Sequence, residues 1–191
     1  MKPIPLLACL LLPVILSGCA AVLVGSAATA GAVHDRRSVG TVIDDQTLEV
    51  AAIDRIYQER DRFGGSRITA IAHNGVLLLA GEVADEALRQ RAGERVQELA
   101  GVRRVINELA VAPPAGVARI SADGALTLRI KAGLLDLDVP GFDASRVNVT
   151  TVRQEVYLMG LLRRAEADAV VNEVRRMRGV HRVIKAFEYL D

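Results

Sequence analysis

The feature that most constrains the fold of this chain is an internal repeat at a spacing of 78 or 79 residues. The same pattern of apolar residues, glycines and arginines occurs twice, and a repeat of this length predicts two copies of one supersecondary unit. The matching segments are 48–50 with 126–128, 67–71 with 146–150, 76–81 with 155–160, and 101–106 with 179–184. We therefore expect one unit over residues 40–111 and a second over 119–191, joined by a proline- and glycine-rich linker over 112–118.

Each copy predicts the order helix, strand, strand, helix, strand. In the first copy, Asn74-Gly75 indicates a tight turn between two strands, because both residues tolerate a positive φ. Gly101 is typical of a helix end for the same reason. The expected elements of this copy are a helix around 48–56, strands over 68–73 and 76–83, a helix over 86–100 and a strand over 102–111. Asp44-Asp45 is expected to precede the first helix and to cap it.

This order predicts an α+β fold for each unit. The strand–helix–strand step crosses over right-handedly, which gives a three-stranded mixed sheet with two helices on one face. Such a small sheet is marginal alone, so we expect the two units to pack against each other. In the second copy the first helix is expected over Gly124–Asp136. Its hairpin carries Arg153-Gln154 in place of Asn-Gly, which predicts a longer or differently shaped turn.

The amino terminus has the pattern of a bacterial lipoprotein signal. Lys2 precedes an apolar run over 4–16, and the run ends at Leu16-Ser17-Gly18-Cys19, which matches the lipobox. We expect residues 1–18 to be removed, Cys19 to carry acyl chains, and residues 19–39 to form a flexible tether. The alternative is an uncleaved membrane helix, which the glycines and the proline of this segment disfavour. Ala20, not Asp, follows the cysteine, which in enterobacterial lipoproteins favours the outer membrane.

Composition excludes other classes of function. A formal net charge of +1 is too small for a nucleic-acid-binding surface. After loss of the signal and acylation of Cys19, no thiol remains for a disulfide or a nucleophile. His34, His73 and His181 are scattered among different segments, and no hydrolase, zinc or phosphate-loop motif occurs. We therefore expect no enzymatic activity, metal, cofactor or small-molecule substrate.

The repeated unit resembles the BON domain. The resemblance rests on Ile68-Thr69-Ala70, on the run from Asn74 to Gly81, and on Gly101-Val102-Arg103-Arg104-Val105. The second copy keeps 156–160 and 179–183. With the lipobox and tether, the chain is similar to lipoproteins of the outer membrane that carry two BON domains. That resemblance implies a lipid-anchored protein facing the periplasm, which binds anionic phospholipid through its second BON domain and supports outer-membrane integrity at the division site.

The second unit is the better candidate for lipid contact. Residues 40–112 hold nine arginines and twelve acids, whereas residues 119–191 hold twelve basic residues and ten acids. Basic residues near an anionic surface contribute ~1 kcal/mol each. On the expected helix 124–136, leucines and cations lie together on the side away from the sheet, which suits contact with headgroups. The expected contact residues are Leu126, Thr127, Leu128, Arg129, Lys131 and Leu135.

An alternative also fits this apolar face. In the first unit Val50, Ile53 and Tyr57 occupy the corresponding positions, so the stripe could instead pack against the neighbouring unit. A separate alternative for the function is an adaptor, in which the outward face of either unit docks an envelope protein such as assembly machinery or an activator of a cell-wall hydrolase. The run Arg175-Arg176-Met177-Arg178 is either a solvated helix face or an extension of the basic patch.

Overall fold

The computed structural model describes residues 35–191. The predicted signal, Cys19 and most of the predicted tether lie outside these residues. Among the helices of the described part, none has the length and apolar character needed to cross a membrane.

The first unit has the predicted α+β architecture. Its strands lie in the order β1-β2-β3, with β1 antiparallel to β2 and β3 parallel to β2. The predicted helix face of Leu48, Ala52 and Ile56 is buried against the sheet. The elements are α2 (Val39–Tyr57), α3 (Arg60–Phe63), β1 (Arg67–His73), β2 (Val76–Val83), α4 (Glu86–Gln97) and β3 (Arg104–Val111).

The second unit repeats this arrangement, with strand order β4-β5-β6 and the same directions. Its core is mainly aliphatic, with Ile130, Leu158 and Val170 fully buried, and it includes Phe187. The elements are α5 (Val117–Leu135), the short 3-10 helix η2 (Ala144–Arg146), β4 (Val147–Val152), β5 (Glu155–Leu162), α6 (Arg164–Val174) and β6 (Arg182–Tyr189). Helix α5 begins seven residues before the predicted Gly124 and includes the last two residues of the predicted linker.

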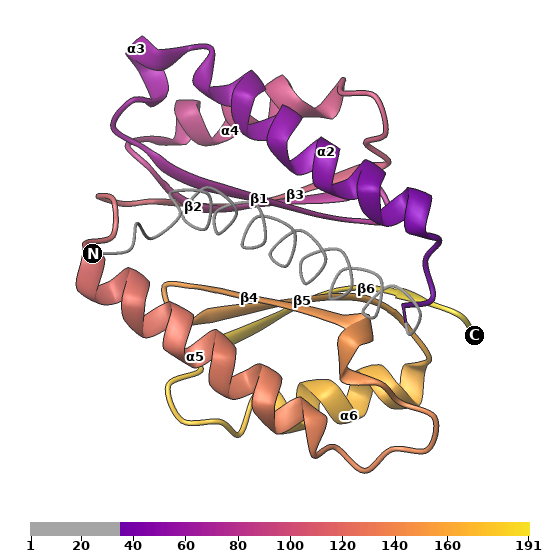
Figure 1. Ribbon diagram of the computed structural model, residues 1–191. Helices are drawn as coiled ribbons and strands as arrows, with labels where there is room; N and C mark the ends of the chain where they lie inside the picture. The colour runs from indigo at the N-terminus through magenta and orange to yellow at the C-terminus, as the bar shows by residue number, and fades with distance from the viewer. Residues whose placement is uncertain (1–34) are drawn as a thin grey trace, which may run out of the picture.

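The two sheets pack face to face, which confirms the expected contact between the units. Figure 1 shows four layers, with α2 and α4 outside one sheet and α5 and α6 outside the other. The layer between the sheets is a separate apolar cluster, and its buried members are Ile71, Val76, Leu78, Ala80, Val152, Tyr157, Met159 and Ala186. Each sheet therefore has one face on its own helices and the other on the partner sheet, so the helices form the outer surfaces.

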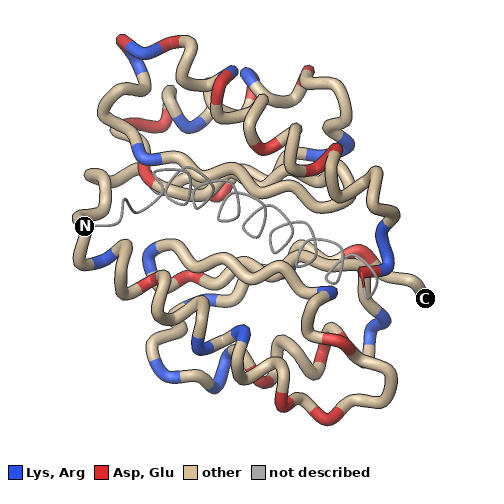
Figure 2. The backbone as a smooth tube through the Cα atoms, viewed as in Figure 1, with Lys and Arg blue, Asp and Glu red and all other residues tan. Residues whose placement is uncertain are grey.

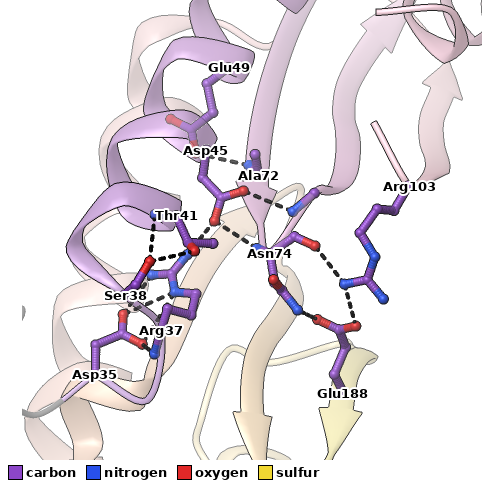
Figure 3. Close-up of polar contacts among 11 residues, drawn as sticks. Asp35, Arg37, Ser38, Thr41, Asp45, Glu49, Ala72, Asn74, Arg103 and Glu188 are labelled. Atoms are coloured by element: carbon purple, nitrogen blue, oxygen red, sulfur yellow. Dashed lines mark hydrogen bonds and ion pairs between the residues drawn. The ribbon is translucent and has the colours of Figure 1, made fainter. Parts of the chain in front are cut away.

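A buried carboxylate on the first helix of each unit holds the hairpin turn. Asp45 accepts hydrogen bonds from the backbone N–H groups of Asn74 (2.6 Å) and Gly75 (2.8 Å), and from the Arg37 guanidinium (2.6 Å), as Figure 3 shows. The prediction that Asp44-Asp45 caps the helix is therefore wrong. The helix starts earlier, and Ser38 caps it by accepting from the Thr41 N–H.

The second unit uses the same device. Asp123 accepts from the backbone N–H groups of Arg153 (2.9 Å) and Gln154 (3.0 Å). Its hairpin has two turn residues, as in the first unit, since Val152 pairs directly with Glu155. The prediction of a longer or different turn is wrong. Arg153 and Gln154 both adopt positive φ, at 56° and 63°, as Asn74 and Gly75 do.

Two neighbouring arginines ahead of α2 connect the units. Arg37 pairs with Asp35 and Asp45 of its own unit. Arg36 reaches the second unit and binds both carboxylate oxygens of Glu166, at 2.7 and 2.8 Å. Further polar contacts between the units, at the edges of the sheets, are Asn74–Glu188, Arg103–Glu188 and Arg182–Glu108.

Candidate membrane-contact surface

Helix α5 carries an apolar stripe on its outward face, interrupted by Lys131. Val117, Leu128 and Leu135 expose 80%, 70% and 77% of their surface. They lie at helical spacing with Gly124 and Lys131, so they share one side of the helix. At 1.5 Å per residue the 19-residue helix is ~28 Å long. The stripe is longer than predicted, because the sequence analysis started the helix at Gly124 and missed Val117 and Ile120.

Of the six predicted contact residues, four lie on this outer surface: Leu128, Arg129, Lys131 and Leu135. Thr127 is half-buried, and its hydroxyl is hydrogen-bonded to that of Thr151 at 2.8 Å. Leu126 is only 3% exposed and lies in the core of the second unit. Including Leu126 in a contact surface was therefore wrong, since its side chain faces the sheet with Ile130.

Packing of the α5 stripe against the first unit is not what the structure shows. The units meet through their sheets, and α5 lies on the opposite face of its own sheet (Figure 1). In the first unit, Val50 is likewise 63% exposed on α2. Ile53 packs partly on the core, and the Tyr57 hydroxyl donates to the Ser66 carbonyl and accepts from the Ile68 N–H.

Cations flank the α5 stripe along the helix, and the exposed Asp136 follows Leu135 at its C-terminal end. Arg119, Arg129 and Lys131 are exposed along the helix, and its one acid, Asp123, is buried. The loop before β6 lies beside α5, because Met177 packs directly over Gly133. This loop adds Arg175, Arg176 and Arg178, all exposed, and Figure 2 shows the basic segments gathered around α5. Within the described residues, none of these six cations forms an ion pair with a carboxylate.

The corresponding helix of the first unit has the opposite charge. Helix α2 also exposes apolar residues, including Val39, Ile43 and Val50, but its exposed charges are Asp44, Asp54 and Arg55. Several arginines of this unit are already neutralised by acids; Arg91 and Arg95, for example, both pair with Glu59. The two helices therefore share an apolar stripe and differ in the charge beside it.

The histidines of the described part of the chain lie in different surroundings. No group of three or more metal-ligating side chains gathers there. His73 is 3% exposed, and burial lowers the pKa of its imidazole, with the Arg37 charge acting in the same direction. His181 is exposed in the loop before β6.

Comparison with known proteins identifies the repeated unit. The family model described as the BON domain matches residues 44–113 and again 122–191. The outer membrane lipoprotein DolP of Haemophilus influenzae is 34% identical over 194 residues, which cover 100% of this chain and 99% of that protein. The 21 kDa hemolysin of Actinobacillus pleuropneumoniae is 34% identical over 158 residues, which cover 82% of this chain and 80% of that protein.

A solved structure, the C-terminal domain of CdsD from the Type III secretion system of Chlamydia trachomatis, matches with 17% identity and a TM-score of 0.31. This match covers 73% of this chain and 97% of that one. Both structural units thus coincide with family matches, and a relative matches along the full length. The chain belongs to the BON-domain family and carries two copies of the domain.

Proposed function

We propose that this protein is an outer-membrane lipoprotein, anchored through Cys19 and facing the periplasm, whose second BON domain binds anionic phospholipid through α5. The observation that carries the proposal is the exposed apolar stripe of α5 beside six cations that have no carboxylate partner among residues 35–191. The lipobox and the full-length likeness to an outer membrane lipoprotein support the anchor and its location. In keeping with the family resemblance, we propose that the protein supports outer-membrane integrity at the division site.

The physical chemistry of α5 suits a shallow membrane contact. Transfer of an exposed leucine side chain out of water contributes about 1.5–3 kcal/mol. A basic residue near an anionic surface adds ~1 kcal/mol and loses that contribution in high salt. The surface lacks the aromatic side chains that commonly anchor proteins at the interface. We therefore propose weak binding by α5, which becomes effective because the acylated tether raises the local concentration at the membrane.

The test is vesicle flotation with the unlipidated mature chain, residues 20–191, which includes every described helix and strand. Wild type should float with vesicles of phosphatidylcholine and phosphatidylglycerol, bind less as salt increases, and stay unbound with phosphatidylcholine alone. Leu128→Glu combined with Leu135→Glu should abolish flotation, because two new carboxylates would enter the stripe.

A matched control is available on the other unit. Ile43→Glu combined with Val50→Glu introduces the same charge change on the exposed stripe of α2 and should leave flotation unchanged. Equal loss in both double variants, or unchanged flotation in the α5 variant, would contradict the assignment to α5.

The second candidate function is a protein-interaction adaptor, and the exposed stripe of α2 beside Asp44 and Asp54 favours it. In that case the docked partner would be an envelope assembly protein or an activator of a cell-wall hydrolase. Docking of this kind would not depend on anionic headgroups. Failure of wild type to float with anionic vesicles would favour the adaptor.

A further inference from the structure

An open cavity of about 740 Å³ lies at the N-terminal end of α5, away from the Leu128–Leu135 part of the stripe. It is formed by the start of α5, the β4–β5 turn and the loop before β6. Three nitrogen-rich side chains line it, namely Arg119 from the helix, Arg153 from the turn and His181 from the loop. Gln154 adds a side-chain amide. Guanidinium and imidazole groups that converge on one cavity are donors suited to a phosphate group.

The acids in this cavity are already bound to other groups. Asp123 is 2% exposed, and its two oxygens accept the Arg153 and Gln154 backbone N–H groups. Glu155 binds Arg182 through both oxygens, at 3.1 and 2.9 Å. Within the described residues, no carboxylate pairs with the side chain of Arg119, Arg153 or His181. Their donors are therefore available to an anion from solution.

The backbone conformation of the β4–β5 turn is unfavourable for the two residues that form it. Non-glycine residues with positive φ are uncommon, and Arg153 and Gln154 are two in succession. The first unit places Asn74-Gly75, the residues best suited to this geometry, at the same positions. Folding alone therefore favours Asn-Gly in the second unit as well, and the Arg-Gln pair is explained if its side chains bind something.

The equivalent cavity of the first unit is lined by different side chains. That cavity is about 730 Å³ and lies between α2, the β1–β2 turn and the loop before β3. Thr41 stands there in place of Arg119, and Asn74 in place of Arg153. Arg103 stands in place of His181, but its guanidinium is bound to Glu188 and the Asn74 carbonyl. Among the described residues, these three positions therefore carry cationic donors without a carboxylate partner only in the second unit. The other cation of the first cavity, Arg55, shares it with the exposed acids Asp44 and Glu98.

We propose that Arg119, Arg153 and His181 form a binding site for a phosphate group, carried either by a lipid headgroup or by a soluble phosphate. Arg153 and Arg119 would bind the phosphate oxygens through their guanidinium N–H groups, and His181 would donate from the third side. The positive end of the α5 dipole adds to the attraction. This site does not depend on lipid contact by the α5 stripe.

The decisive variant replaces Arg153-Gln154 with the Asn-Gly of the first unit. Isotope-labelled residues 20–191 would be titrated with sodium phosphate at constant ionic strength, set with sodium chloride, and followed by NMR. Wild type should show saturable shifts at 153–154 and at the His181 ring. The Arg153→Asn/Gln154→Gly variant should bind phosphate at least tenfold more weakly while unfolding at a higher temperature, because the strained turn is relieved. A purely structural turn would give the thermal gain without any change in phosphate binding.

A second arm identifies the source of the phosphate. If vesicles containing phosphatidic acid bind wild type more tightly than the turn variant, the group is a lipid headgroup. If both bind these vesicles equally while only wild type binds inorganic phosphate, the group belongs to a soluble molecule. The Leu128→Glu/Leu135→Glu variant should keep its phosphate shifts, which separates this site from the proposed α5 membrane contact. Absence of saturable shifts in wild type, or equal affinity in the turn variant, would overturn the site.

Discussion

Replacement of Asp45 by alanine should strongly destabilise the protein, because its carboxylate joins three parts of the first unit. The side chain is 4% exposed, and it accepts two backbone N–H groups of the β1–β2 turn and one N–H of Arg37. Without it, the turn amides and the Arg37 side chain, which is 13% exposed, lose a charged acceptor with little water to replace it.

The expected magnitude follows from these contacts. A hydrogen bond to a charged acceptor contributes about 1.5–3 kcal/mol, and an unsatisfied buried donor costs about 1–3 kcal/mol. Arg37 keeps its pair with Asp35, so the two unsatisfied amides dominate and predict a loss of about 2–6 kcal/mol for Asp45→Ala. If Asp45 only capped the helix, its replacement by alanine would cost ~1 kcal/mol. Its replacement by asparagine would then be nearly neutral, because aspartate and asparagine cap about equally well. In this structure Asp45→Asn should also destabilise, because one acceptor oxygen becomes a donor.

The measurement is urea unfolding of residues 20–191 followed by circular dichroism. Asp44→Ala is the matched control, because the neighbouring carboxylate is exposed and should change the free energy of unfolding by less than ~0.5 kcal/mol. Asp123→Ala should lie between them, since Asp123 holds the two turn amides without an arginine. A loss below ~1 kcal/mol for Asp45→Ala, or a neutral Asp45→Asn, would refute the reasoning.

Two further predictions concern the contact between the units. Hydrogen bonds from Arg36 hold the pKa of Glu166 below its usual value of 4.5, so this pair stabilises the fold above that pH and the stabilisation is lost as the pH falls through the lowered value. Arg36→Ala should therefore reduce the Tm at neutral pH, and calorimetry should show the difference from wild type shrinking in acid; a pH-independent difference would contradict this. Leu78→Ala should cost about 2–5 kcal/mol by leaving a cavity between the sheets, whereas exposed Leu128→Ala should cost below ~0.5 kcal/mol, and similar unfolding midpoints in urea would argue against the face-to-face packing.

The repeat and the apolar periodicity predicted most of the fold, because they report local preference and burial together. Leu48, Ala52 and Ile56 lie in the core as expected. The start of α5 was missed because residues 117–124 are mostly small, polar or exposed. No buried apolar residues recur there at helical spacing. Likewise the Arg153-Gln154 turn could not be predicted locally, because the carboxylate that stabilises it comes from Asp123, thirty residues earlier.

For the candidate surface, sequence position predicted the outward residues of α5 but not their surroundings. Lys131 and Leu135 follow from helical spacing alone. The contribution of Arg175 to Arg178 depends on Met177 lying over Gly133, a contact between distant segments. The same limit applies to the cavity lined by Arg119, Arg153 and His181. These residues come from three segments that meet only in the folded chain.

For a chain anchored through Cys19, as proposed above, the adjacent arginines ahead of α2 have a mechanical consequence. Arg37 is bound to the first unit and Arg36 to the second, so the chain enters the folded body at the boundary between them. Tension on the anchor would be divided between two ion pairs on opposite sides of that boundary. The pull would then act on both units together. It would not act on the N-terminal end of α2 alone, where it would unwind the helix turn by turn.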